Sequence, residues 1–174
     1  MKRAIALLEK HNLLKIISDE LDINLEIPHI AYVEVKRPDS KAILFTNVVD
    51  RKNSKKFKEP VLMNVFCNED AVKLFIGDGD KIGSEIESLL KLKPPVTFSE
   101  KLSTLGKLFS LKNTIPKKIK GKGICQEVIK LGADAKLSDL PVIKTWEDDA
   151  GAFITMGQVY TQSLNGELKN LGMY

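Results

Sequence analysis

The chain has 174 residues, of which 43% are hydrophobic, and it carries 27 basic against 23 acidic side chains. This length and apolar content predict a globular protein of one domain or two small ones and exclude a disordered chain. No apolar run reaches the roughly 18 residues of a membrane-spanning helix, and the start MKRAIALLEK returns to charge too soon for a signal peptide. We therefore expect a soluble, cytoplasmic protein.

The net charge of +4 hides an uneven distribution. The segment 91–122 contains nine lysines, no arginine and a single acid, Glu100, so it carries a net charge of +8. Two interpretations stay open: a contact for nucleic acid, or a solvated connector whose lysines lie in water. Because arginine and aromatic residues usually accompany phosphate and base recognition, we expect no nucleic-acid partner.

The first 67 residues alternate between helical and strand-like patterns. Apolar spacing predicts a helix at 4–10, a strand at 13–22, a helix at 27–35, and buried strands at 41–49 and 59–67. Pro28 suits the first turn of the second helix. The apolar side of this helix is expected to consist of Ile27, Ile30, Ala31 and Val33.

Two further helices are predicted after the second buried strand. Asn68 is placed to cap the first of them, which Gly77 ends. Its inward-facing side chains are expected to be Val72, Leu74 and Phe75. The second helix, over residues 80–92, carries Ile82, Ile86, Leu89 and Leu90 on one side and stops at Pro94 and Pro95. Strands that alternate with helices indicate an α/β domain.

Past Lys122 the pattern changes to strand-like pieces divided by Gly, Asp and Pro. These pieces are 123–131, 139–146, 151–163 and 167–174. The Asn165-Gly166 pair between the last two predicts a tight β-hairpin. Three or four strands are too few to close a barrel, so we expect an incomplete β unit. The connector before it holds at most a short helix on Leu102, Leu105, Leu108 and Phe109.

Generic motifs assign no chemistry to the chain. The Gly77-Asp78-Gly79-Asp80 run lacks the spacing of a phosphate or calcium loop and is interpreted as a turn. The acids of the 146–151 stretch, WEDDAG, either bind a divalent cation or form a solvated turn, and the turn is favoured. His11 and His29 are isolated and suit surface or cap positions. Cys67 and Cys125 show no disulfide or zinc spacing, so buried thiols are expected.

Several linked motifs in the second half nevertheless occur in one order. They are Cys125-Gln126-Glu127-Val128, Asp139-Leu140-Pro141, Trp146, Gly151-Ala152-Phe153-Ile154-Thr155 and Asn170-Leu171-Gly172-Met173-Tyr174. In this order and spacing the chain resembles the UbiD family of decarboxylases, and the stretches within 6–77 are similar to that family's N-terminal domain. The resemblance covers nearly the whole chain. It implies an α+β protein: an N-terminal α/β domain at 1–112, ending in the basic connector, and the first strands of a truncated flavin-reductase-like split β-barrel at 123–174.

The resemblance also implies an activity. Members of this family are non-oxidative carboxy-lyases that use prenylated FMN, Mn²⁺ and K⁺ to decarboxylate aromatic or α,β-unsaturated carboxylic acids, as in ubiquinone and menaquinone biosynthesis. A flavin prenyltransferase supplies the modified flavin. By residue matching, Asn170 corresponds to a metal ligand and Leu171 to the main-chain carbonyl at the K⁺ site, while Thr155, Gly172 and Met173 correspond to flavin-contacting positions.

The family motif continues with an arginine after the tyrosine, and the proton-transferring Arg/Glu pair lies beyond residue 174. No catalytic residue is therefore assigned to this chain. We expect the 174 residues to be an inactive N-terminal fragment of such a decarboxylase. The alternative is a non-catalytic binding or assembly module derived from the N-terminal domain. A homo-oligomer is compatible with both interpretations.

Overall fold

The computed structural model describes residues 1–91 and 120–173. The chain forms two compact units, one made of residues 1–72 and 136–174 and the other of residues 73–135. Most of the basic connector, the helix predicted on Leu102–Phe109, and Tyr174 lie outside the described residues. None of the helices within the described ranges is long and apolar enough to span a membrane.

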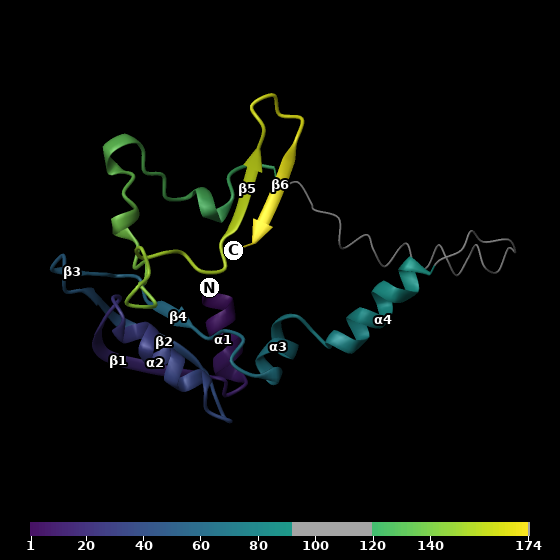
Figure 1. Cartoon of the computed structure of the whole chain (residues 1–174), viewed down its shortest axis with the longest axis horizontal. Helices are drawn as coiled ribbons and strands as arrows, with labels where there is room; N and C mark the ends of the chain where they lie inside the picture. Colours follow the sequence, from purple (N-terminus) through teal and green to yellow (C-terminus); the bar gives the residue numbers. More distant parts are fainter. Residues whose placement is uncertain (92–119, 174) are drawn as a thin grey trace, which may run out of the picture. The chain divides into compact units, whose positions relative to one another are not determined.

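The described residues form a mixed α+β structure with four α-helices and two separate sheets, neither of them closed (Figure 1). The helices are α1 (Lys2–Lys10), α2 (Glu26–Val35), α3 (Glu69–Phe75) and α4 (Gly79–Leu90). The strands are β1 (Leu14–Asp22), β2 (Ala42–Asp50), β3 (Lys55–Lys56), β4 (Val61–Met63), β5 (Gln158–Gln162) and β6 (Lys169–Met173). All four predicted helices are confirmed, as are the strands predicted at 13–22 and 41–49. The strand predicted at 59–67 is confirmed only for Val61–Met63.

The larger sheet is built around β2. Strand β1 pairs with β2 in parallel through the crossover helix α2, which is a β-α-β unit. Strands β3 and β4 both pair with β2 in antiparallel orientation. Strand β2 is therefore central, and its burial on both faces explains why its sequence, AILFTNVVD, is an almost continuous apolar run.

Helix α2 covers this sheet with one face only. Ile27 and Ala31 are buried, and Ile30 packs against the core, as predicted. The expectation for Val33 was wrong, because 53% of its surface is exposed. Ile27, Ile30 and Ala31 fall on one helical stripe, whereas Val33 lies about 200° around the axis from Ala31 and so points away from the sheet.

The core of the sheet includes one residue from the second half of the chain. Ile143 is 5% exposed and packs with Ile23, Ile27, Ile43, Phe45, Val48, Phe57 and Val61. Its neighbour Lys144 donates its main-chain N–H to Ile23 O (3.2 Å), and its carbonyl accepts from Leu25 N–H (3.1 Å). Lys144 thus forms a parallel β-bridge with Asn24, just past the end of β1, and this bridge lies next to the core that the first half of the chain forms.

The caps predicted for α3 are confirmed. The Asn68 Oδ1 atom accepts the main-chain N–H of Ala71 at 2.9 Å, and its Nδ2 donates to Ser40 O at 2.9 Å. Gly77 takes φ +100° and its N–H donates to Lys73 O (2.9 Å), which ends the helix. Asp78 caps α4 by accepting from Asp80 N–H (3.0 Å). Gly77 and Asp78 therefore lie in the connection between α3 and α4, whereas Gly79 and Asp80 form the first turn of α4 and not part of the predicted turn.

The strand-like pieces predicted at 123–131 and 139–146 were wrong as strands. Residues Ile124–Gln126 and Leu137–Asp139 form short 3₁₀ helices, and Ile143 and Lys144 make only isolated bridges. Short apolar runs of this kind do not distinguish a strand from other compact conformations, because burial by distant residues decides between them.

The predicted C-terminal hairpin is confirmed, with a wider turn than expected. Strands β5 and β6, the yellow arrows of Figure 1, pair in antiparallel register from Gln162–Lys169 to Gln158–Met173. Asn165 lacks the positive φ that a two-residue turn requires, whereas Gly166 has φ +75°. Gly166 N–H donates to Ser163 O, and Ser163 N–H donates to Leu168 O, both at 2.9 Å.

Candidate functional site

Four of the five predicted site residues lie on β6, and its pairing with β5 sets their faces. Asn170 is opposite Thr161 and Gly172 is opposite Val159. Directly paired side chains share a face of an antiparallel sheet, so the Asn170 side chain and Gly172 lie on the same face. The side chains of Leu171 and Met173 lie on the other face. Both are exposed within the described structure.

The backbone of Leu171 is directed away from β5. The bond from Ser163 N–H to Leu168 O shows that this pair is hydrogen-bonded. Hydrogen-bonded and non-hydrogen-bonded pairs alternate along an antiparallel ladder, so Tyr160 and Leu171 form a non-hydrogen-bonded pair. The Leu171 carbonyl oxygen therefore points outward from the free edge of β6, where a ligand can reach it.

Thr155 lies apart from these four residues along the chain. It is in a turn before β5, next to Met156, which takes φ +57°. No hydrogen bond joins Thr155 to β6 in the part of the chain that the structure describes. The assignments of Thr155, Asn170, Leu171, Gly172 and Met173 to a cofactor and metal site stay predictions.

The donors on β6 fit part of a hard-cation site. Asn170 is exposed, and its amide has no hydrogen-bond partner among residues 1–91 and 120–173. An amide oxygen and a main-chain carbonyl are the oxygen ligands that Mn²⁺ and K⁺ accept. Within the described residues no group of three or more His, Cys, Asp or Glu side chains could hold a metal. The hairpin therefore offers two oxygen ligands of a larger set.

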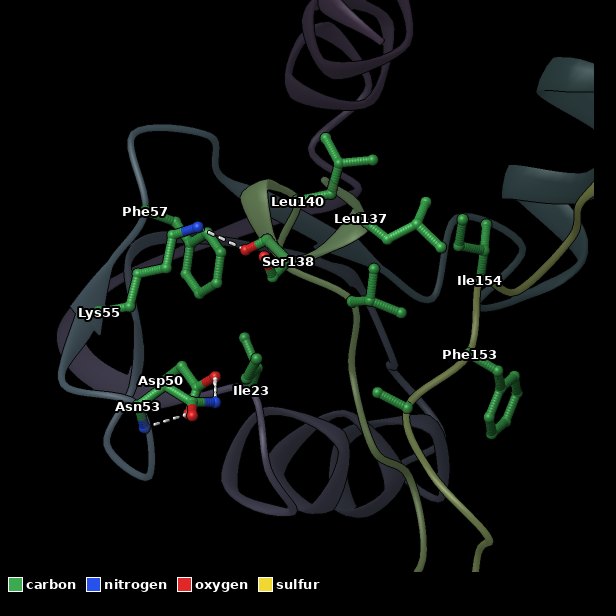
Figure 2. A pocket seen from close by; sticks show the side chains of 12 residues that line it. Ile23, Asp50, Asn53, Lys55, Phe57, Leu137, Ser138, Leu140, Phe153 and Ile154 are labelled. Atoms are coloured by element: carbon green, nitrogen blue, oxygen red, sulfur yellow. Dashed lines mark hydrogen bonds between the residues drawn. The ribbon is translucent and has the colours of Figure 1, made fainter. Parts of the chain in front are cut away.

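A pocket of about 720 Å³ lies next to Val142, which precedes the core residue Ile143 in the chain (Figure 2). Its walls come from the first sheet and from residues that precede the hairpin. The lining side chains are mostly apolar and include Ile23, Phe57, Leu137, Leu140, Phe153 and Ile154. This volume and apolar lining are typical of small-molecule sites. Ile154 lines the pocket and precedes Thr155 in the chain, so the pocket extends to the neighbour of a residue predicted to contact flavin.

The polar edge of this pocket is already internally paired. Lys55 Nζ contacts Asp139 Oδ1 at 3.1 Å, donates to the main-chain oxygen of Ser138, and lies 5.2 Å from the centre of the Phe57 ring. Asn53 Nδ2 donates to Asp50 Oδ2 at 2.7 Å. Figure 2 shows the Lys55–Ser138 and Asn53–Asp50 bonds. Because Lys55 is matched by Asp139, this edge carries no unpaired positive charge for a carboxylate substrate.

A second pocket, of about 350 Å³, lies at the start of α2, and we call it the Tyr32–Trp146 pocket. Its lining residues are Leu25, Glu26, Pro28, His29, Tyr32, Thr145, Trp146 and Glu147. The Tyr32 and Trp146 rings meet edge to face, with centroids 5.4 Å apart and planes at 76°. Considered alone, Trp146 suits a core aromatic position, yet 55% of its surface is exposed.

An ion pair borders the second pocket. Glu26 Oε2 accepts the main-chain N–H of Asp22 at 2.8 Å, and Oε1 pairs with Arg51. These two bonds lower the pKa of Glu26, with the backbone bond the larger cause. Asp22 is 7% exposed and accepts from the main-chain N–H groups of Asn24 and Arg51. This network fastens the end of β1 to the start of α2.

The remaining motif residues have structural roles. Asp149 Oδ2 accepts Trp146 N–H at 2.9 Å, which makes the acidic stretch a turn. His11 is the C-cap of α1 and His29 is exposed on α2. Cys67 is a free, buried thiol whose pKa is raised by burial. These expectations are confirmed, and the side chain of Cys125 lies outside the described part of the structure.

Two family models match this chain. The model of the 3-octaprenyl-4-hydroxybenzoate carboxy-lyase N-terminal domain matches residues 5–90, and the model of the Rift-related domain of the same carboxy-lyase matches residues 117–174. The chain belongs to the UbiD family. This result confirms the resemblance deduced from the Asn170–Met173 and Asp139–Thr155 motifs, and it identifies the chain as related to decarboxylases.

Proteins similar to this chain occur in Helicobacter pylori and Aquifex aeolicus. An uncharacterized protein of Helicobacter pylori strain 26695 is 43% identical over all of this chain and 29% of its own length. Its counterpart in strain J99 is 42% identical over the same shares. An uncharacterized protein of Aquifex aeolicus is 36% identical over 96% of this chain and 33% of its own length. The chain spans about a third of the length of these relatives.

Sequence reasoning did not find either pocket. The larger one depends on Lys55 and Phe57 meeting residues 137–154, and the smaller one on Tyr32 meeting Trp146. These residues are separated by 80 positions or more, and no local pattern in a single UbiD sequence predicts such a pairing.

Proposed function

We propose that this chain is the N-terminal portion of a UbiD-type carboxy-lyase that decarboxylates an aromatic or α,β-unsaturated carboxylic acid, in ubiquinone or menaquinone biosynthesis. The single observation that carries the proposal is the match of both family domains, in order, to residues 5–90 and 117–174. The finer parts of the proposal are prenylated FMN, Mn²⁺, K⁺ and a split β-barrel that begins with β5 and β6.

The hairpin geometry supports a role in holding the cofactor phosphate and its metal. Asn170 would present its amide oxygen to Mn²⁺ from one face of the hairpin, and Leu171 would present its outward carbonyl to K⁺ from the strand edge. Gly172 shares the face of Asn170 and has no side chain, which allows a planar ligand to approach the backbone closely. Thr155 and Met173 would complete the contacts to the flavin.

Each of these residues binds or orients, and none transfers a proton. When bound, prenylated FMN supplies the electron sink for a reversible decarboxylation without net redox change. The modified flavin would come from a flavin prenyltransferase, which is the partner protein we propose. A positioned acid or base typically contributes a factor of about 10² to 10⁴ in rate. We therefore propose that the 174 residues alone do not turn over an aromatic or acrylic acid, and that a non-catalytic assembly role is the alternative.

The test uses the complete polypeptide, co-expressed with a flavin prenyltransferase and purified with Mn²⁺ and K⁺. We expect bound flavin in the absorbance spectrum and about one Mn²⁺ per chain by elemental analysis. Asn170→Ala should lower the manganese content at least about tenfold at limiting metal. Asn24→Ala is the matched control, because Asn24 is also exposed and its side chain makes no hydrogen bond within the described residues.

Two outcomes would contradict the proposal. A purified complete polypeptide without flavin and manganese would remove the cofactor assignment. Turnover of a cinnamic or hydroxybenzoic acid by the 174-residue chain with the same cofactors would show that the proton-transfer groups lie within this chain after all.

A further inference from the structure

The Tyr32–Trp146 pocket has the geometry of an aromatic corner. The two ring planes stand at 76° with centroids 5.4 Å apart, and both side chains line the pocket. Tyr32 and Trp146 are 45% and 55% exposed. Two nearly perpendicular, accessible aromatic walls are the arrangement with which proteins surround organic cations.

The structure already contains a cation at one of these rings. Lys36 Nζ lies 5.0 Å from the centre of the Tyr32 ring, within the range of a cation–π interaction. Lys36 is the C-cap residue of α2 and does not line the pocket. The Tyr32 ring thus already makes one cation–π contact, and the Lys36 charge repels a second cation at the same ring.

The carboxylates at the pocket are the groups that attract a cation to it. Glu147 is exposed, and its carboxylate has no partner in the described part of the chain, since Lys144 Nζ donates to the main-chain oxygen of Glu147 instead. Glu26 is occupied, because its two oxygens bind Asp22 N–H and Arg51. The Glu147 carboxylate beside the two rings therefore makes no ion pair within the described residues, although the Lys144 ammonium lies at its main-chain oxygen.

We propose that the Tyr32–Trp146 pocket binds a small quaternary ammonium ion. A primary ammonium or a guanidinium needs several hydrogen-bond acceptors at fixed positions, and of the two carboxylates that line this pocket only that of Glu147 is not already engaged. A quaternary ammonium needs no acceptor and gains from aromatic faces and one nearby carboxylate. The volume of about 350 Å³ is at the lower end for ligand pockets and suits such a group.

The test uses Trp146, the sole tryptophan of the chain, as its own reporter. The 174-residue protein is titrated with choline chloride at constant ionic strength, and in parallel with 3,3-dimethylbutan-1-ol, the uncharged isostere of choline. We expect a saturable change in tryptophan fluorescence with a dissociation constant in the range of about 1–10 mM for choline. The isostere should bind at least about fivefold more weakly, because it lacks the charge.

Variants separate the aromatic and electrostatic contributions. Tyr32→Leu should weaken choline binding by about fivefold and Glu147→Gln by about twofold to threefold, whereas Lys36→Gln should strengthen it by about twofold through loss of a like charge. Tyr160→Leu and Glu9→Gln are matched controls outside the pocket and should change nothing. Circular dichroism checks that each variant is folded.

Equal binding of choline and its isostere would show a merely apolar pocket and would overturn the proposal. The absence of any saturable fluorescence change up to about 100 mM choline would overturn it as well. These results do not depend on flavin, metal or turnover, so they are independent of the proposed decarboxylase function. If Tyr32→Leu does not fold, the isostere comparison and Glu147→Gln still decide the question.

Discussion

Replacing Ile143 by alanine should destabilise the fold of the first half of the chain, although Ile143 belongs to the second half. Ile143 is 5% exposed and packs among seven other buried residues of the sheet core. The change removes three carbon atoms, worth roughly 0.8 kcal/mol each, and leaves a cavity that the surrounding strands fill only in part. We expect a loss of about 3 kcal/mol in the free energy of unfolding.

Urea denaturation, followed by far-ultraviolet circular dichroism, measures this loss as a shift of the midpoint at unchanged slope. The matched control is Ile16→Ala on β1, where 56% of the side chain is exposed, and it should cost less than about 1 kcal/mol. Amide hydrogen exchange adds a local readout, because Lys144 and Leu25 N–H groups form the bridge next to Ile143. If Ile143→Ala costs no more than Ile16→Ala, residues 143–144 do not dock on the core and the reasoning fails.

Two further predictions concern single polar groups. Asn68→Ala should lower the free energy of unfolding, measured by urea denaturation, by about 1–2 kcal/mol, because it removes both the cap to Ala71 N–H and the bond to Ser40 O. Asn68→Asp should keep the cap and so lose less stability. Equal losses in the two variants would contradict the capping role. Glu26 has a lowered pKa in the folded chain, so its stabilising contribution is present above its ordinary pKa of 4.5 and is lost as the pH falls through the lower folded value. Thermal melts should show a shallower loss of stability below pH 4.5 in Glu26→Gln than in the parent protein, and identical pH profiles would refute the role of this carboxylate.

The elements predicted well are those whose signals are local. Asn68 and Gly77 mark the two ends of α3 because a cap needs only the backbone groups of its own helix. Strand β2 was predictable because it is central in its sheet and buried on both faces, which leaves a long apolar run, whereas most residues of the edge strand β1 are exposed or half-buried. The hairpin was found from Asn165 and Gly166, although only Gly166 adopts the conformation that the pair suggested.

The elements predicted poorly depend on distant partners. The run around Cys125 contains a 3₁₀ helix where a strand was expected, since a few apolar residues satisfy either conformation. Trp146 lies at a pocket because Tyr32 meets it across more than 100 residues. For the candidate site, the sequence supplied Asn170 and Leu171 through a family motif, but the faces on which they lie required the register of β5 and β6.

The position of Ile143 also bears on how the protein is synthesised. Strands β1 to β4 are synthesised well before Ile143. Ile143 follows Val61 by roughly eighty residues, which corresponds to about 4–16 seconds of translation. During that interval the nascent sheet lacks one of the side chains that close it, and Ile23 and Phe57 are left accessible to chaperones or to neighbouring chains. A polypeptide that stops after residue 90 would remain permanently in this unfinished condition, and we expect it to depend on chaperones more than its helix and strand content suggests.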